Sequence, residues 1–251
     1  PPNLPIVHVS VRSSEMIKYA SNDFLALKIS YINEIANFCE IVGADIEEVA
    51  RGMGMDRRIG SNFLKAGIGY GGSCFPKDTK ALNFQSDHAG VKLKTVKATI
   101  DVNREQRIKL IDKARRFFPT FRDVRVAIIG LTFKPGTDDL REAPAKQNID
   151  ILLNEGADII AWDPLGAENF RKRYPNCAIN FAKDIDEALT DADVCLIMTE
   201  WEKIVEYPLD NYKKYMRRPL VFDGRNCYKL SEVEKHEIFY DSIGRKIVDT
   251  L

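Results

Sequence analysis

The residues best suited to chemistry lie in one short stretch, GIGYGGSCFPKD, at positions 67–78. Glycines at four of its first six positions permit positive φ angles and a close approach of backbone N–H groups to a ligand. Pro76 favours the first turn of a helix, which places Cys74 beside a positive helix end. This field, with Lys77 nearby, favours the thiolate that attacks carbonyl carbon. Spacing alone leaves a second interpretation open, a glycine hinge followed by a buried, inert cysteine.

A lysine and an asparagine share one face of an earlier predicted helix. Lys18 and Asn22 are four residues apart and therefore stack, among largely apolar neighbours. A buried lysine can stabilise a developing oxyanion while the asparagine holds substrate or water, or it can simply pair with a carboxylate. For Asn33 and Glu34, further along this helix, we expect helix-packing hydrogen bonds.

Charged residues also follow two predicted strands. The first strand leads into GLTFKPGTDDLREAP, where a dinucleotide-binding sheet would carry G-x-G-x-x-G, so that fingerprint is absent. This loop contains Lys134 and Arg141, and FDGRN places Arg225 after another strand. The two loops can hold an anionic nucleotide sugar, with a bidentate guanidinium on phosphate, or they can be solvated turns. Asp163 also follows a strand, and we predict a turn residue.

The elements that must position these residues are of two kinds. The first 118 residues are predicted to be mostly helical, with the first helix buried on most sides. The predicted helices cover 14–42, a short segment from Asp45, about 76–87, and 95–118.

The remainder predicts an α/β domain with a doubly wound parallel sheet. Apolar runs at 124–131, 158–162, 194–199 and 219–223 alternate with helical segments around 144–155, 165–174 and 184–190. Strands that are apolar throughout and separated by helices indicate a parallel sheet covered on both faces. We therefore expect an extended leader over 1–13, an all-helical domain over 14–118 and a Rossmann-like domain over 119–251.

Composition narrows the class of protein. Lys plus Arg and Asp plus Glu each total 37, which argues against nucleic acid or an anionic membrane as the main partner. No apolar run approaches the roughly 18 residues of a membrane span and no signal peptide opens the chain, so we expect a soluble, cytoplasmic protein. Five widely spaced cysteines without a CxxC pair argue against a disulfide framework and a metal site. The start at Pro1 suggests a piece of a longer protein.

Four segments together resemble the UDP-glucose/GDP-mannose dehydrogenase family of nucleotide-sugar 6-dehydrogenases. They are KYASNDFLALKISYINEIANFCE, DRRIGSNFLKAGIGYGGSCFPKD, GLTFKPGTDDLRE and FDGRN, in family order over most of residues 14–228. GSCFPKD resembles the UDP-glucose branch, with the GDP-mannose and UDP-N-acetylhexosamine branches as alternatives. The resemblance implies oxidation of UDP-glucose to UDP-glucuronate with two NAD, through a thiohemiacetal and a thioester on Cys74.

The resemblance also implies roles for individual residues. Lys18 would stabilise the oxyanion, while Asn22 and Asp78 place or activate water near Cys74. The implied substrate contacts are Arg58, Phe63, Lys65, Tyr70, Gly71, Phe133, Lys134 and Arg225, and the implied NAD contacts are Lys77 and Arg141. The implied assembly is a homodimer paired through the central helices, with Arg58 acting across its interface.

The family's amino-terminal Rossmann domain, with its glycine fingerprint and a glutamate that serves in proton transfer, is missing from this sequence. The resemblance therefore implies a chain with little activity alone, since most of the NAD site lies on the missing domain. Two other functions stay open. One is a non-enzymatic nucleotide-sugar-binding or dimerisation module, and the other is a thiol-redox protein built on Cys74, which needs a resolving cysteine.

Overall fold

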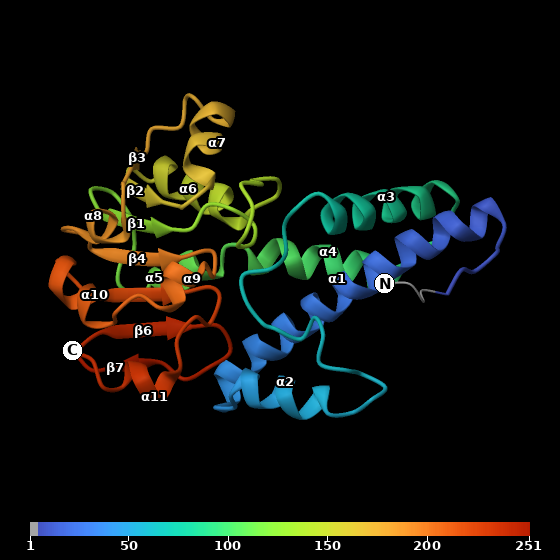
Figure 1. Cartoon of the computed structure of the whole chain (residues 1–251), viewed down its shortest axis with the longest axis horizontal. Coiled ribbons are helices and arrows are strands. Elements are labelled where there is room, and N and C mark those ends of the chain that lie inside the picture. Colours follow the sequence, from blue (N-terminus) through green and yellow to red (C-terminus); the bar gives the residue numbers. More distant parts are fainter. Residues whose placement is uncertain (1–4) are drawn as a thin grey trace.

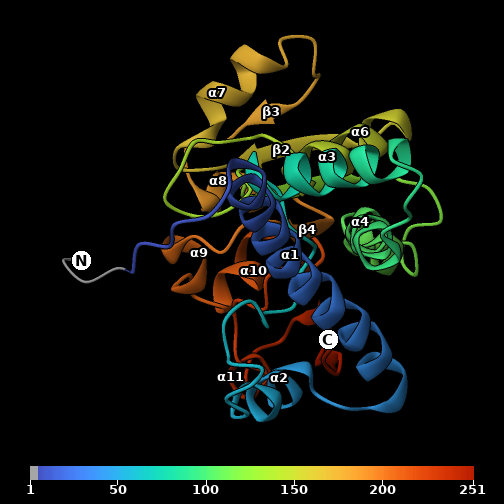
Figure 2. The same ribbon diagram turned by 90° about the vertical axis from the view of Figure 1, so that its right-hand side faces the viewer.

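A helical part and a sheet part make up the computed structural model, which describes residues 5–251 (Figure 1). The helical part contains α1 (Val11–Val42), α2 (Ile46–Gly54), α3 (Cys74–His88) and α4 (Lys94–Gln106). In Figure 1, α1 runs diagonally out of the sheet part, and α3 and α4 lie beside it. Figure 2, turned by 90°, shows the same three helices as separate neighbours in front of the sheet. No helix in the described part of the chain is long and apolar enough to cross a membrane.

Helix α1 differs from the prediction at its start and in its burial. It begins at Val11, three residues before the expected Ser14, because the Ser10 hydroxyl accepts a hydrogen bond from the N–H of Ser13 at 3.2 Å. Residues 5–10 have no regular structure, and positions 1–4 of the expected leader lie outside the described residues. The expected burial on most sides is wrong, since long apolar side chains such as Phe24 and Phe38 are exposed.

The other helices also shift their bounds. Helix α3 begins at Cys74, two residues before Pro76, which puts the thiol inside its first turn. The helix expected over 95–118 is split, because α4 ends at Gln106 and α5 (Lys109–Ala114) follows after a two-residue turn.

The predicted doubly wound sheet is confirmed, with an antiparallel strand added at one edge. Its order is β3-β2-β1-β4-β5-β6-β7, and all neighbouring strands are parallel except β6 and β7. The strands are β1 (Arg125–Ile129), β2 (Asp158–Trp162), β3 (Asn180–Phe181), β4 (Val194–Ile197), β5 (Leu220–Asp223), β6 (Phe239–Ser242) and β7 (Val248–Asp249). The sequence did not predict β3, β6 or β7. Strands β3 and β7 are each only two residues long.

Helices cover both faces of this sheet. They are α5, α6 (Pro144–Asn154), α7 (Gly166–Arg173), α8 (Ile185–Leu189), α9 (Glu202–Val205), α10 (Asp210–Tyr215) and α11 (Leu230–Val233). Along β1, Val126 and Ile128 enter one buried cluster and Ala127 and Ile129 the other. The first cluster also contains Ile32 of α1, so the helical part packs directly onto one face of the sheet.

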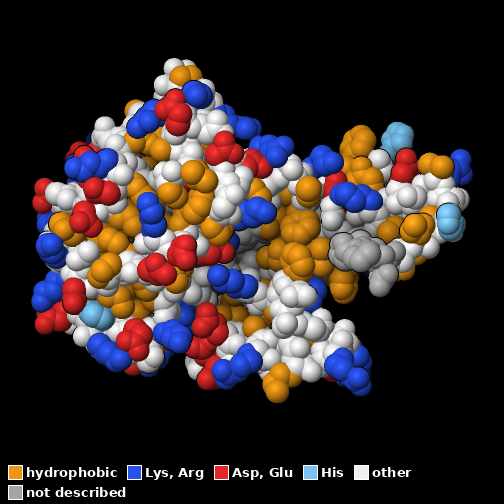
Figure 3. Space-filling view, in the orientation of Figure 1, with side chains coloured by type: hydrophobic (Ala, Val, Ile, Leu, Met, Phe, Trp, Pro, Cys, Tyr) orange, Lys and Arg blue, Asp and Glu red, His pale blue; other side chains and the backbone are white. Residues whose placement is uncertain are grey.

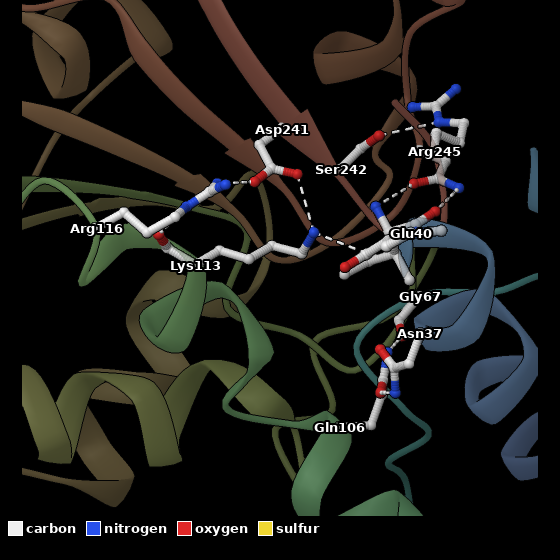
Figure 4. A network of polar contacts seen from close by, with 12 residues as sticks. Asn37, Glu40, Gly67, Gln106, Lys113, Arg116, Asp241, Ser242 and Arg245 are labelled. Atoms are coloured by element: carbon white, nitrogen blue, oxygen red, sulfur yellow. Dashed lines mark hydrogen bonds and ion pairs between the residues drawn. The ribbon is translucent and has the colours of Figure 1, made fainter. Parts of the chain in front are cut away.

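A polar network fastens the same two parts together (Figure 4). The ammonium group of Lys113 on α5 lies 2.9 Å from Asp241 Oδ1 on β6 and 2.7 Å from Glu40 Oε1 on α1. Arg116 also pairs with Asp241, and Glu40 accepts a hydrogen bond from the N–H of Gly244 at 2.8 Å. The boundary between the parts is therefore held by buried charge as well as by apolar packing.

Candidate functional site

Cys74 is exposed and is the first residue of the 15-residue helix α3. Its Sγ lies 3.8 Å from the hydroxyl oxygen of Ser73, the residue that caps this helix. The burial that the alternative interpretation expects for this cysteine is therefore wrong. The thiol lies where the positive end of a helix favours an anion.

Asp78 gathers three side chains one turn further along α3. Its Oδ2 lies 2.5 Å from both Lys18 Nζ and Asn22 Nδ2, and its Oδ1 lies 3.2 Å from Lys77 Nζ. Burial raises the pKa of Asp78, but the hydrogen bonds from these three residues outweigh it and leave the pKa below its usual value. The side chain of Asp78 is only 2% exposed, so this carboxylate is a buried anchor for residues of two helices.

Lys18 belongs to this cluster without being buried. Its side chain is 57% exposed, which contradicts the expected burial. The hydrogen bond to Asp78 raises the pKa of Lys18, and the nearby Cys74 contributes in the same direction. The charge of Lys18 therefore lies within electrostatic range of Cys74.

Sequence reasoning missed Asp23, the neighbour of Asn22 on α1. Asp23 is 6% exposed, and within residues 5–251 neither of its carboxylate oxygens has a hydrogen-bond partner. Burial, with a smaller contribution from the charge of Asp78, raises the pKa of Asp23 to about 6. The only sequence signal was an acidic residue at a helix position that packs inward.

Seven of the eight residues expected to contact substrate line one cavity of about 330 Å³, at the boundary between the helical part and the sheet part. They are Phe63, Lys65, Tyr70, Gly71, Phe133, Lys134 and Arg225. The eighth, Arg58, lies apart from them, since its guanidinium pairs with Asp56 and its side chain is 89% exposed. Asn33 and Glu200 also line this cavity, and neither was predicted to do so.

The glycine-rich loop at 67–72 packs between the two parts of the chain. Its N–H groups mostly bond to protein acceptors, namely Gly67 to Asn33 Oδ1 (2.9 Å), Ile68 to the Gly224 carbonyl (3.0 Å), Tyr70 to Asn103 Oδ1 (2.8 Å) and Gly72 to the Arg141 carbonyl (2.8 Å). A Cβ at Gly71 would clash with the Glu142 carbonyl oxygen and lie 2.9 Å from Phe133 Cβ. The glycines therefore allow close packing, and most of these amides are not free for the sugar and its diphosphate.

Arg225 is also committed to the protein. Its Nε donates to the Met198 carbonyl at 2.9 Å and its Nη1 to the Gly69 carbonyl at 3.0 Å. Nη2 alone has no partner among the described residues. The expected bidentate contact with phosphate is thus not free as the side chain stands, and Arg225 joins the glycine loop to the sheet.

The predictions of packing hydrogen bonds for Asn33 and Glu34 on α1 have different outcomes. Asn33 is fully buried, and its Oδ1 accepts a hydrogen bond from the N–H of Gly67 in the glycine loop. Figure 4 shows a second link to this loop, in which Asn37 donates to Gln106 and Gln106 donates to the Gly67 carbonyl. Glu34 is exposed and its side chain forms no hydrogen bond in residues 5–251, so the expected packing bond of Glu34 is wrong.

A second cavity, of about 620 Å³, is lined by Gly72, Ser73 and Pro76, whereas Gly71 and Phe75 line the first cavity. Residues directly before and after Cys74 therefore line both cavities, although Cys74 itself lines neither. The predicted NAD contacts both line this second cavity, together with four more cationic side chains. The six are Lys77, Lys80, Arg107, Arg141, Lys146 and Arg173.

Asp163 organises the loops at the carboxyl ends of the strands, so its prediction as a turn residue alone is incomplete. Its Oδ2 accepts hydrogen bonds from the N–H of Leu131 at 2.7 Å and from Trp201 Nε1 at 3.1 Å. Its Oδ1 accepts from the N–H groups of Leu165 and Gly166 at 3.0 and 2.6 Å. One buried carboxylate thus fixes the loops after β1, β2 and β4.

Two family models match this chain. Residues 12–105 match the central domain of the UDP-glucose/GDP-mannose dehydrogenase family, and residues 127–230 match the UDP binding domain of the same family. A UDP-glucose 6-dehydrogenase of Bacillus subtilis (strain 168) is 49% identical over 99% of this chain and 56% of its own length. One from Rhizobium meliloti is 46% identical over 96% of this chain and 55% of its own length. The chain thus spans about half the length of the curated relatives it matches.

Solved structures share the same fold. A UDP-glucose dehydrogenase from Pyrobaculum islandicum superposes with a TM-score of 0.87 and 31% identity, over 97% of this chain and 54% of that one. An NDP-N-acetyl-D-galactosaminuronic acid dehydrogenase from Methanosarcina mazei Go1 gives 0.81 at 24% identity, over 94% of this chain and 52% of its own. The second likeness shows the fold alone.

Proposed function

This chain belongs to the UDP-glucose/GDP-mannose dehydrogenase family, and on that premise we propose that it supplies the reactive thiol and the sugar-nucleotide site of a UDP-glucose 6-dehydrogenase. The observation that carries the proposal is the position of Cys74, exposed at the start of α3 and flanked in sequence by residues that line two cavities. The cavity of about 330 Å³ would hold the UDP-sugar, and the cationic one would face the cofactor.

The thiol enables the second of two oxidations at C6 of the sugar. The thiolate of Cys74 bonds to the aldehyde carbon, and the C=O electron pair moves to oxygen. The resulting thiohemiacetal expels a hydride as the C=O bond re-forms, which leaves a thioester. Water then cleaves the C–S bond, so that the carboxylate leaves and the thiol is restored.

Lys18 and Asp78 suit the charges that develop in these steps. Negative charge grows on the sugar oxygen when sulfur attacks, and the raised pKa of Lys18 keeps its ammonium group charged. Asp78, ionised and bonded to Lys18 and Asn22, fixes the positions of both side chains. Asn22 and Asp78 can hold the water that hydrolyses the thioester.

NAD is the hydride acceptor that we infer for this chemistry. Lys77 and Arg141 fit its anionic diphosphate, because both line a cavity in which cations outnumber carboxylates. The sheet carries no G-x-G-x-x-G after β1, so we infer that most contacts to the cofactor come from residues outside this chain. The isolated chain is then expected to bind sugar nucleotide without oxidising it.

A homodimer through α1 accounts for the exposed apolar side chains of that helix. Phe24, Tyr31 and Phe38 recur every seven residues and are each about half exposed or more, so they form one stripe. Figure 3 shows apolar side chains gathered over the helical part, beside the hollow that separates it from the sheet part. Arg58, whose only ion pair in the described part of the chain is with Asp56, would extend toward a partner's cavity.

Capture of an aldehyde tests the covalent step without any cofactor. The chain is mixed with a UDP-sugar whose C6 is a ¹³C-labelled aldehyde, and the carbon resonance is followed by NMR. A new thiohemiacetal resonance is expected for the unmodified chain and for the control Cys177→Ser, but not for Cys74→Ser. Capture by the Cys74→Ser variant would refute the covalent role.

Calorimetry tests the sugar-nucleotide site and its preference. The chain is titrated with UDP-glucose, UDP-N-acetylglucosamine and GDP-mannose, and UDP-glucose is expected to bind most tightly. Preferential binding of GDP-mannose would move the assignment to that branch of the family. No heat from any of the three would refute the proposed site.

A further inference from the structure

Glu200 occupies the place in the sheet where ligands of doubly wound folds bind. In the sheet, β2 and β3 lie on one side of β1, and β4 and the later strands lie on the other side. The direction in which successive strands are added therefore reverses between β1 and β4. Ligands lie outside the carboxyl ends of the strands at such a switch point. Glu200 follows β4 by three residues, and the hydroxyl of the adjacent Thr199 donates to the Thr132 carbonyl after β1 at 2.5 Å.

The carboxylate of Glu200 is held near two cations without a close bond to either. Its Oε1 lies 3.5 Å from Lys65 Nζ, and its Oε2 lies 3.5 Å from Arg225 Nε. Oε2 accepts no hydrogen bond from any described residue, because Arg225 donates to the Met198 and Gly69 carbonyls instead. Burial raises the pKa of Glu200, but the charges of Arg225 and Lys65 outweigh it and leave the pKa below its usual value. Glu200 is thus an ionised acceptor with unused capacity.

The other polar side chains of the 330 Å³ cavity are mainly donors. Lys65, Lys134 and Arg225 present cations, and the amide oxygen of Asn33 is already taken by the N–H of Gly67. A sugar nucleotide brings a diphosphate, which cations match, and hydroxyl groups on the rings beside it, which need acceptors. Glu200 supplies the carboxylate in this lining.

We propose that Glu200 is a specificity-determining residue that accepts hydrogen bonds from the ring hydroxyls flanking the diphosphate of the bound nucleotide. The proposal rests on the proposed function, since it assumes that the cavity holds a sugar nucleotide. The hydroxyls belong to either the ribose or the hexose, and the two sources are separated by the choice of ligand.

The test is calorimetry of the 251-residue chain with pyrophosphate, 2′-deoxy-UDP, UDP and UDP-glucose. Glu200→Met removes the acceptor and its charge, Glu200→Gln keeps a weaker acceptor, and Glu202→Gln is the exposed control two residues on. Pyrophosphate should bind Glu200→Met at least as well as the unmodified chain, since a negative charge has gone. In Glu200→Met, the affinity for a ligand that carries the recognised ring hydroxyls should fall about tenfold or more, compared with the affinity for pyrophosphate. This is the loss expected when one charge-assisted hydrogen bond is removed.

The ligands then identify the ring. If the ribose is read, the unmodified chain prefers UDP over 2′-deoxy-UDP and Glu200→Met does not. If the hexose is read, UDP is unaffected and UDP-glucose alone loses affinity. If each Glu200 variant changed the affinity for all four ligands by the same factor, the inference would be overturned. The proposed sugar-nucleotide site would not be refuted by that result. Should the variants not fold, equal affinity of the unmodified chain for pyrophosphate, 2′-deoxy-UDP and UDP-glucose would overturn it. No binding of UDP or UDP-glucose to the unmodified chain would instead refute the proposed function.

Discussion

Lys18 and Asp78 lie 60 residues apart in the sequence, yet only 2.5 Å separates Nζ from Oδ2. The contact joins α1 to the second turn of α3, which begins with Cys74. One buried carboxylate thereby holds the cation of α1 against the helix that begins with the thiol, within electrostatic range of Cys74. The pair also leaves Lys18 more than half exposed, so its charge remains available to a ligand.

Lys18→Ala should slow aldehyde capture by Cys74 far more than it weakens binding of UDP-glucose. Loss of one oxyanion donor typically costs about 100- to 1000-fold in rate. Lys18 does not line the 330 Å³ cavity, so the dissociation constant should change little. Exchange spectroscopy at the labelled C6 measures the rate, calorimetry measures binding, and Lys97→Ala on α4 is the control. Equal losses in rate and affinity would assign Lys18 a binding role instead.

Asp23 should make the chain less stable as the pH rises from about 4 to 6. Its pKa is raised from 3.8 to about 6 in the folded chain, so between these values the folded state binds more proton than the unfolded state. The free energy of unfolding therefore falls through this window, by about 2 to 3 kcal/mol at about 1.4 kcal/mol per pH unit. Asp23→Asn stays neutral and should escape this loss.

Urea unfolding at several pH values between about 4 and 7.5 measures the effect. The advantage of Asp23→Asn over the unmodified chain should be small near the lower end and reach its plateau once the pH exceeds the folded-state pKa of about 6. Glu34→Gln, an exposed change on the same helix, is the control. An advantage that does not vary with pH would mean that Asp23 does not titrate in this window.

The sequence predicted the features whose cause is local. Four strands and the position of Cys74 beside the start of a helix follow from short apolar runs and from Pro76, without any distant partner. Strand β6 was missed because its FYDS sequence carries Asp241, whose charge is matched by Lys113, 128 residues away. No local pattern contains that pairing.

The candidate site was likewise predicted only in part from the sequence. Its members were found through motifs, but the arrangement depends on contacts between distant segments. The glycine pattern predicted a loop whose backbone N–H groups approach a ligand, whereas Gly71 is needed because the Glu142 carbonyl and Phe133 approach it from the sheet part. Asp23 and Glu200 were missed, and Asp163 was predicted only as a turn residue, because a single acidic residue has a role only once its surroundings are known.

Gly71→Ala should disrupt the loop that lines both cavities. The new Cβ would clash with the Glu142 carbonyl oxygen and lie 2.9 Å from Phe133 Cβ, so the loop or the sheet part must move. Such overpacking typically costs about 1 to 3 kcal/mol, and affinity for UDP-glucose should fall as well. Urea unfolding and calorimetry measure the two effects.

Gly52→Ala is the matched control for that substitution. Gly52 lies inside α2, and no atom lies within 4 Å of the position that an alanine methyl group would take. Alanine should therefore stabilise the chain by about 0.5 to 1 kcal/mol. UDP-glucose should bind the Gly52→Ala variant normally. If both glycine variants behaved alike, close packing would not be the reason for glycine at position 71.

Asp241→Asn should destabilise the chain by about 1 to 3 kcal/mol, because Lys113 then keeps only Glu40 as a charged partner and Arg116 loses its carboxylate. Asp241 is 1% exposed and Lys113 9%, and Arg116 pairs with the same carboxylate. Since the network joins α1 and α5 to β6, urea unfolding should show the loss for the whole chain (Figure 4).

The control is Glu232→Gln in the exposed pair with Lys235, which should cost less than about 1 kcal/mol. Joint replacement, Lys113→Met with Asp241→Leu, should recover much of the loss, because the charges that it leaves unpaired, on Glu40 and Arg116, are partly exposed to water. If the double variant were as unstable as the sum of its single changes, the cost would come from lost packing and not from an orphaned charge.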